Sequence, residues 1–469
     1  MILLVTVPDG SSLNLEPEDG PLCRVWSFFR SKVSGFAKKI WKLGADDPRK
    51  FIHSIKVGLA LALVSVFYYM RPLYDGVGGT AMWAIMTVVV IFEFTVGGSL
   101  YKGLNRATAT LSAAFLAWSI HWLASKFGEP TEHIILGASV FILSSAATFS
   151  RFILTVKTKF DYGVTIFILT FNFIAVSGYR VDDLLALAQR RLFTIMIGVS
   201  ICIIVSIVVF PVWAGEDLHL LIIRNMEKLA NSLEYSATEY FKEGENADAH
   251  KSFYQKSQGY KCVLNSKASE DSLANLAIWE PSHGPFRIGH PWKQYLKVGS
   301  AMRSCSYSIE ALNSFINSEV QVPRSLKNHL SDVCTKLSLE YHKVLKEAAK
   351  FLRTMRKSST IELMMAEMNE AVEDVHSVLR SLKPAAEEEQ KQHMLATESV
   401  NMMKVLPLIS VVSLLIEISV KIEGIVDAVQ DLADLAGFAA DDNEKQEEIK
   451  PANSEETQRN ETMKVIQQV

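Results

Sequence analysis

The chain has 469 residues, 49% of them apolar, and a formal net charge of −3. A net charge so close to zero excludes bulk electrostatic binding of nucleic acid as the default interpretation. The charge is unevenly distributed: residues 49–215 carry 13 Lys/Arg against 7 Asp/Glu, whereas residues 216–469 carry 29 against 38. The apolar part of the chain is therefore cationic and the polar part acidic. The five cysteines occur singly, which indicates neither a disulfide framework nor a zinc site.

The N-terminal segment, residues 1–48, is expected to be cytosolic, basic and amphipathic. Its short apolar start lacks a basic leader and is interrupted by Pro8, so a cleaved signal peptide is not expected. The stretch Arg24–Lys56 holds nine Lys/Arg and two acids, an excess that favours the cytosolic side. Trp26 and Trp41, with the basic residues, fit a helix lying on the inner leaflet. A mobile basic arm remains the alternative.

Residues 49–215 are expected to form six transmembrane helices. Each apolar stretch approaches the ~20 residues that cross the hydrocarbon, and apolar residues surround each helix. The predicted helices are Phe51–Met70, Val77–Phe94, Tyr101–Leu123, His133–Phe149, Asp161–Val176 and Leu192–Val212. Because six crossings return the chain to its starting side, both termini are expected in the cytosol.

Residues 216–438 are expected to fold as a cytosolic helical bundle, and residues 439–469 as a disordered acidic tail. The predicted helices are Leu218–Phe241, which should continue the sixth membrane helix, 250–275, Lys293–Ser318, Arg324–Arg356, Ile361–Leu382 and Thr397–Phe438, with a loop at Trp279–Trp292. The apolar run Val405–Ile416 has only 12 residues and contains Pro407, which favours a buried core helix over a seventh crossing. The predicted fold class is therefore an all-α membrane protein.

Sequence motifs of common enzymes are absent. The chain contains no phosphate-binding loop, nucleophile elbow, zinc-protease motif or dinucleotide fingerprint, so neither an ATP-driven pump nor a familiar hydrolase is indicated. No enzyme activity and no cofactor are expected, and no metal site is firmly predicted. The scattered His53, His121 and His133 favour interfacial or packed positions. Glu93 is either an interfacial carboxylate or the ion-pair partner of a basic residue.

Basic residues inside the apolar segments are the candidate site. A charge within a membrane segment is costly, so it usually faces protein or water, and rings of Arg or Lys select anions in pores. Lys102 and Arg106 lie four residues apart on one helix face. Arg190 and Arg191 are adjacent and diverge by about 100°, so only one of them can face a pore. The predicted anion path comprises Lys102, Arg106, Arg180 and Arg191, and snorkelling of these side chains to the membrane surface is the alternative.

Several motifs follow one another in a defined order between about Asp46 and Phe438. They are Trp83–Phe94 (WAIMTVVVIFEF), Lys102–Arg106 (KGLNR), Lys157–Gly163 (KTKFDYG), Phe171–Phe173, Ser177–Arg180, Pro211–His219, Trp279–Pro281 and His290–Tyr295. In this order they resemble the plant aluminium-activated malate transporter family. The resemblance implies a homodimeric anion channel that passes malate and inorganic anions down their electrochemical gradient. It does not imply activation by aluminium.

The resemblance also assigns three further sets of candidate residues: outer acids that could bind a hard cation, an aromatic regulatory segment, and a gating or structural motif. In that order they are Asp75, Asp182 and Asp183; Phe171 and Phe173; and Trp279, Glu280 and Pro281. Surface solvation is the alternative for the acids, and helix or lipid packing is the alternative for the two phenylalanines.

The expected partners are malate, inorganic anions, the lipid bilayer and a second copy of the chain, with no nucleic acid. One rival is a proton-coupled organic-acid exporter of similar six-helix architecture, for which buried proton-carrying acids are expected and only Glu93 is available. A membrane-anchored helical scaffold is a second rival. The plasma membrane is the favoured location, with the vacuolar membrane as the alternative.

Overall fold

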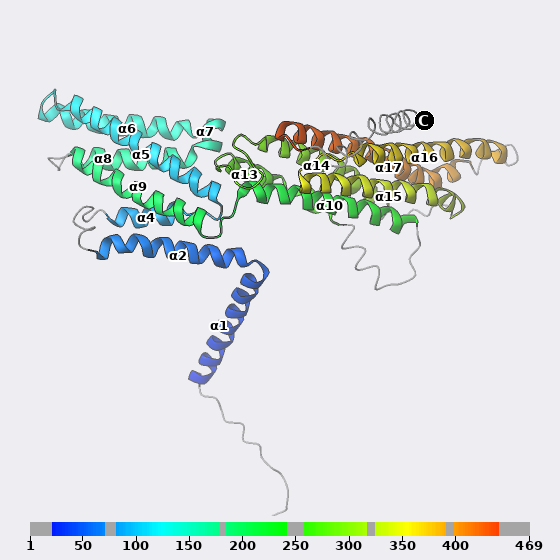
Figure 1. Cartoon of the computed structure of the whole chain (residues 1–469), viewed down its shortest axis with the longest axis horizontal. Coiled ribbons are helices and arrows are strands. Elements are labelled where there is room, and N and C mark those ends of the chain that lie inside the picture. Colours follow the sequence, from blue (N-terminus) through cyan, green and yellow to red (C-terminus); the bar gives the residue numbers. More distant parts are fainter. Residues whose placement is uncertain are drawn as a thin grey trace, which may run out of the picture.

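The helices form two groups that lie end to end. The computed structural model describes residues 21–70, 81–177, 184–241, 258–316, 324–390 and 398–439. All regular elements in these ranges are α-helices, which confirms the all-α class for this part of the chain. Figure 1 shows the helices of residues 48–208 in one group and those of residues 214–436 in the other, with α1 (Pro21–Asp46) projecting away from both.

The first group contains the apolar helices. They are α2 (Pro48–Tyr69), α4 (Ala81–Ile91), α5 (Val96–Ala124), α6 (Glu129–Ser150), α8 (Asp161–Ser177) and α9 (Leu184–Val208), with the short α7 (Leu154–Lys159) between α6 and α8. Three stretches in the described residues are long and apolar enough to cross a membrane: Pro48–Tyr69, Thr131–Ser150 and Gln189–Val208. Met82–Ile91 and Asp161–Val176 are apolar but shorter. The six predicted segments therefore include three candidate spans by length and composition.

Small residues let the helices of this group approach closely. At Gly198 of α9, an added Cβ would lie 2.9 Å from the Ala84 carbonyl oxygen of α4, so any larger residue would push the two helices apart. The outer surface is apolar, since Phe141 and Phe149 of α6 are 74% and 72% exposed. Large apolar side chains exposed in this way are typical of a surface that meets lipid.

A turn separates the two groups. We expected the sixth segment to reach Val212 and to continue into Leu218–Phe241, and this prediction is wrong. Helix α9 ends at Val208, and α10 (Ala214–Phe241) begins after an irregular turn. Phe210 has a φ of 43°, and the following Pro211 disfavours helical geometry in the residue before it. The Phe210 carbonyl accepts a 2.7 Å hydrogen bond from the buried Lys56 ammonium of α2.

The second group is a bundle of long, charged helices. It contains α10, α14 (Trp292–Ile316), α15 (Arg324–Thr354), α16 (Thr360–Gln390) and α17 (Glu398–Ala436), with the shorter α12 (Tyr260–Leu264) and α13 (Lys267–Ala277). We predicted a single helix over 250–275, and its described part is divided at Asn265 and Ser266 instead. The Ser266 hydroxyl donates to Glu270 at 2.6 Å, a local bond that competes with helix continuation.

The apolar run of α17 lies inside this bundle. Leu408, Val411 and Leu415 are at most 2% exposed and belong to one core cluster with residues of α14 and α15. The Tyr341 hydroxyl of α15 donates to the Leu415 carbonyl at 2.6 Å. One face of the predicted segment Val405–Ile416 is therefore buried in the bundle, whereas Leu406 and Ile409 on its other face are exposed.

Candidate anion pathway and its junction with the charged bundle

Two buried arginines carry positive charge into the apolar group. Arg106 of α5 is 6% exposed and Arg191 of α9 is 3% exposed. Neither forms an ion pair with a carboxylate among the described residues. Arg106 donates to the Tyr162 hydroxyl at 3.4 Å, but its Nε has no hydrogen-bond partner among the described residues. Arg191 likewise has two nitrogens, Nε and Nη1, without a described partner. Both guanidinium groups therefore keep donors that an anion could use.

Aromatic rings flank Arg191. Its Cζ lies 3.9 Å from the ring centroid of Trp83 in α4 and 3.8 Å from that of Phe173 in α8. The two rings meet edge to face, with their centroids 5.5 Å apart. Cation–π contacts of this kind partly replace the hydration of a buried guanidinium without neutralising its charge. Trp83 was missed as a site residue, because the sequence gives no signal that connects it to Arg191.

The predicted aromatic segment is divided between two environments. Phe173 contacts Arg191, whereas Phe171 is 1% exposed and stacks on Phe167, with their centroids 6.0 Å apart. Phe171 also belongs to a small core cluster with Ala113 of α5. The expected alternative, helix packing, therefore describes the position of Phe171, whereas Phe173 packs against the same cluster and also contacts Arg191.

Lys102 and Arg106 share one helix face, as their spacing predicted. Both contact Tyr162 of α8: Lys102 Nζ lies 5.8 Å from its ring centroid, and Arg106 donates to its hydroxyl. Lys102 also forms an ion pair with Glu93, which precedes α5. Of the two readings of Glu93, the structure thus supports an ion-pair partner. The charge of Lys102 is compensated, and that of Arg106 one turn later is not.

The remaining predicted cations and acids lie elsewhere. Arg190 is exposed while Arg191 is buried, so the predicted divergence of the two side chains is confirmed. The exposed Lys126 lies 5.2 Å from the ring centroid of Trp122, beyond the end of α5. Four predicted site residues are outside the described residues: Asp75, Arg180, Asp182 and Asp183.

The Glu280 carboxylate joins two helix starts. Its Oε1 accepts hydrogen bonds from the backbone N–H of Gly97 in α5 at 3.2 Å and of Ala214 in α10 at 2.6 Å, and its Oε2 accepts from Gly215 at 3.0 Å. The first N–H groups of a helix have no partner within the helix and carry partial positive charge, so a carboxylate is well suited to both ends. Burial raises the pKa of Glu280, and the three N–H donors and His283 oppose that rise.

The rest of the Trp279–Pro281 motif also lies on this junction. Trp279 packs edge to face on Tyr101 of α5, with centroids 5.5 Å apart. The Pro281 carbonyl accepts a hydrogen bond from His283 Nδ1 at 2.8 Å, and the His283 ring stacks on Trp213, with centroids 3.9 Å apart. A motif far from the apolar segments in sequence is therefore in direct contact with the first turns of one of them.

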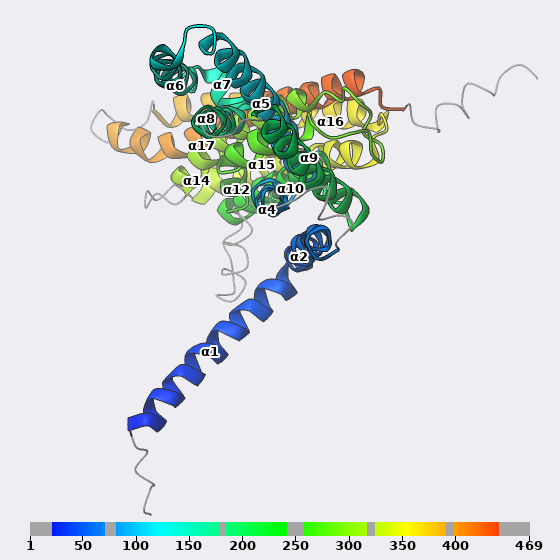
Figure 2. The same cartoon turned by 90° about the vertical axis from the view of Figure 1, so that its left-hand side faces the viewer.

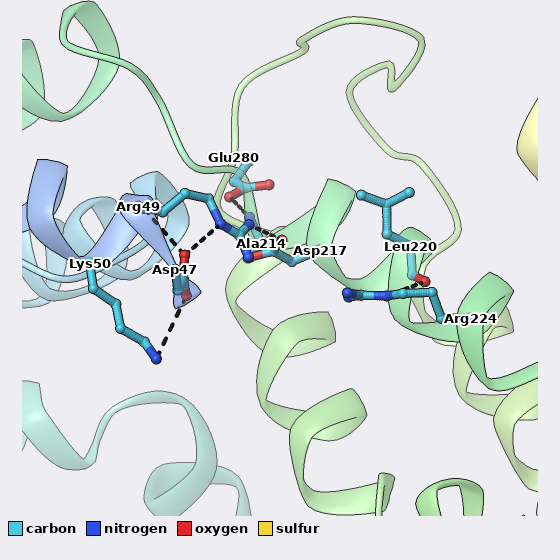
Figure 3. A network of polar contacts seen from close by, with 8 residues as sticks. All are labelled: Asp47, Arg49, Lys50, Ala214, Asp217, Leu220, Arg224 and Glu280. Atoms are coloured by element: carbon cyan, nitrogen blue, oxygen red, sulfur yellow. Dashed lines mark hydrogen bonds and ion pairs between the residues drawn. The ribbon is translucent and has the colours of Figure 1, made fainter. Parts of the chain in front are cut away.

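A second tie connects the start of α2 to α10. Asp47 caps α2 through the Arg49 N–H, and the Arg49 guanidinium donates to Asp217 of α10 at 2.9 Å. Figure 3 shows these side chains next to Glu280 and the first residue of α10, Ala214. The starts of α2, α5 and α10 thus meet at one place between the two helix groups.

Sequence comparisons match most of the chain to one family. The profile of the family described as "Aluminium activated malate transporter" matches residues 41–386. The chain is similar to aluminum-activated malate transporter 10 of Arabidopsis thaliana, at 45% identity over 94% of this chain and 95% of the relative. It is also similar to aluminum-activated malate transporter 1 of Triticum aestivum, at 44% identity over 87% of each chain.

Proposed function

Since this chain belongs to the aluminium-activated malate transporter family, a family of transport proteins rather than enzymes, we propose that it is an anion channel. Malate and inorganic anions would pass through it down their electrochemical gradient. The observation that carries the proposal is the burial of Arg106 and Arg191 in the apolar group with no carboxylate partner among the described residues. An uncompensated cation in such a place is costly unless an anion or water reaches it.

The arrangement of the cations suits conduction rather than trapping. A dicarboxylate that enters the span loses hydration, and fixed cations offset that loss. The Arg191 guanidinium contacts two aromatic rings and that of Arg106 donates to a tyrosine, so neither offers all of its N–H donors to the anion. Lys102 is paired with Glu93, which lowers the field at that point. Several cations of moderate field let an anion enter and leave.

The proposed topology has six crossings, by α2, α4, α5, α6, α8 and α9. The starts of α2 and α5 lie at the junction with the charged bundle, and so does the turn after α9. We propose that this junction faces the cytosol, that residues 216–438 form a cytosolic domain, and that both termini are cytosolic. A C-terminal tag at Val469 should then be inaccessible to antibody applied outside intact cells, and labelling from outside would refute the topology.

Carboxylates favour the channel over the proton-coupled exporter. Among the described residues of the apolar group, Glu93 pairs with Lys102, and Asp161 forms two hydrogen bonds with Arg151, at 2.7 and 3.1 Å. Each of these two carboxylates has a cationic partner and is about 40% exposed, so neither is the isolated buried acid that a proton carrier inside the membrane requires. The proposed homodimer follows the resemblance given by the sequence motifs. The plasma membrane is the proposed location, with the vacuolar membrane as the alternative.

Reconstitution tests the proposed function. Purified chain in liposomes with asymmetric malate, nitrate or chloride should give currents that reverse at the Nernst potential of the anion, regardless of a pH gradient. A reversal potential that follows the pH gradient would establish the exporter instead. Absence of current from protein that is correctly inserted would favour the helical scaffold.

A further inference from the structure

Helix α1 presents an apolar stripe that no other described residue covers. Val33, Phe36 and Ile40, spaced three and four residues apart, are 57%, 65% and 54% exposed. This spacing sets them on one side of the helix. The sequence continues the same spacing toward both ends of the helix, at Leu22, Trp26, Phe29 and Leu43. Figures 1 and 2 show α1 extending away from both helix groups.

The charge of α1 decides which surface the stripe fits. The helix carries six Lys/Arg and a single acid, Asp46, at its last position. If two copies paired along the stripe, Arg30 and Lys39 would flank the contact, and the only acid within α1 is Asp46 at its far end. A cationic helix with an apolar stripe is suited instead to a surface that is anionic outside and apolar beneath, as a bilayer with acidic phospholipids is.

The connection of α1 to α2 places α1 close to the membrane surface. Only Asp47 separates α1 from α2, the candidate span that begins at Pro48. The end of α1 is therefore held at the level where α2 leaves the hydrocarbon. At 1.5 Å per residue the 26-residue helix reaches about 39 Å from this point, far enough to lie along the membrane beside the helices of the apolar group.

We propose that α1 lies on the cytosolic surface of the membrane and binds anionic phospholipid headgroups, with Val33, Phe36 and Ile40 in the acyl boundary. The proposal rests on the topology proposed above, which sets the start of α2 at the cytosolic surface. Its consequence concerns the junction. Bound α1 would fix the position of Asp47 and Arg49, and so of their tie to Asp217. The lipid composition of the inner leaflet would thereby act on the contact between α2 and the charged bundle.

The test uses the full chain in nanodiscs of phosphatidylcholine alone or with about one third phosphatidylserine. After Cys23 and Cys262 are replaced by serine, a nitroxide is attached to Phe36→Cys on the stripe or to Lys38→Cys, two residues away on the opposite side. Collisions with oxygen, which concentrates in lipid, and with a water-soluble nickel complex report the environment of each label. Ile40→Cys repeats the stripe measurement, so that loss of one aromatic residue does not decide the outcome.

With phosphatidylserine present, the label at position 36 should favour oxygen and the label at 38 the nickel complex. Each basic residue near an anionic surface contributes about a fivefold preference. Replacing Arg30, Lys39 and Lys42 with glutamine should therefore weaken docking on the order of a hundredfold and return the label at 36 to water. The matched control replaces the exposed Lys261, Lys267 and Lys293 of the charged bundle and should change nothing.

Two results would overturn the proposal. If the label at position 36 stays in water on anionic membranes, α1 is a mobile arm. If it is shielded from both oxygen and nickel, a protein surface covers the stripe, either the charged bundle or a second copy. Anion currents measured in liposomes of the same lipids keep this inference separate from the channel proposal. A conducting chain with α1 in water refutes only the lipid contact, and a docked α1 without current refutes only the channel.

Discussion

The contribution of the Glu280 carboxylate to the junction between the two helix groups can be tested by removing single hydrogen bonds. Glutamine has the shape of glutamate but offers one acceptor oxygen and one NH2 group. Glu280→Gln can at best keep the bonds from Gly97 and Ala214 through the amide oxygen, which leaves the Gly215 N–H facing another donor. An unsatisfied buried N–H costs about 1–3 kcal/mol, and the lost charge removes about 0.3–1 kcal/mol at each helix start.

Part of this loss is recovered, because the neutral amide avoids the desolvation that raises the pKa of Glu280. We expect a net weakening of about 1–2 kcal/mol, which corresponds to an about 5- to 30-fold larger open population of the first turns. Hydrogen–deuterium exchange followed by mass spectrometry should detect it in peptides covering 94–100 of α5 and 212–218 of α10. Both peptides should exchange faster, since one carboxylate holds both helix starts.

The matched control is Glu216→Gln, which removes an exposed carboxylate from the same first turn of α10. It should leave the exchange of both peptides near that of the parent chain. Glu280→Asp keeps the charge but shortens the side chain by one methylene, so it should restore at most part of the protection. Unchanged exchange in Glu280→Gln at both peptides would refute the assignment of Glu280 as the link between α5 and α10.

Three further predictions concern the pathway, the core and acid stability. Arg191→Gln should reduce malate current about tenfold at equal surface abundance, because a unit charge near the path stabilises the passing anion by on the order of 1–2 kcal/mol. Lys126→Gln is the control. Equal currents in the two variants would favour snorkelling of Arg191. Leu415→Asp should lower the unfolding free energy by about 3–5 kcal/mol through an unpaired buried charge, whereas Ser413→Asp on the exposed face of α17 should be near neutral in thermal unfolding. Burial lowers the pKa of His290 to about 4, so the stability that depends on its neutral form is complete above about pH 6.5 and is lost as the pH falls toward 4. His290→Asn should therefore make the unfolding free energy less dependent on pH between these values. An unchanged pH dependence would contradict this.

Most helices could be predicted from composition and periodicity alone. Helices α14 to α17 begin within a residue of the positions predicted for them, because their charged and apolar residues alternate with a helical period over many turns. The end of α9 was placed four residues too late, although Pro211 gave a physical reason for an earlier stop. The prediction extended the helix to Val212 because the residues before it are apolar, whereas the helix ends before Pro211.

The candidate site could be predicted only in part. Charges in apolar helices stand out in a sequence, so Arg106 and Arg191 were identified, and the angle between adjacent helical residues separated Arg191 from Arg190. The rings of Trp83 and Phe173 that flank Arg191 come from two other helices, and their convergence depends on tertiary packing. The contact of Glu280 with Gly97, 183 residues away, has the same origin. The sequence near Glu280 or near Gly97 gives no indication that the two residues are in contact.

The bond from Lys56 to the Phe210 carbonyl has a mechanical consequence. It joins α2, the first apolar helix, to the turn that follows α9, the last one, and the two helices share a hydrophobic core with α4. The same turn leads into α10, whose first residues are held by Glu280 and Arg49. A tilt of α10 therefore cannot be absorbed by the turn alone. It would displace the end of α9 and the start of α2 together, because the Lys56 ammonium of α2 is bonded to the turn between α9 and α10.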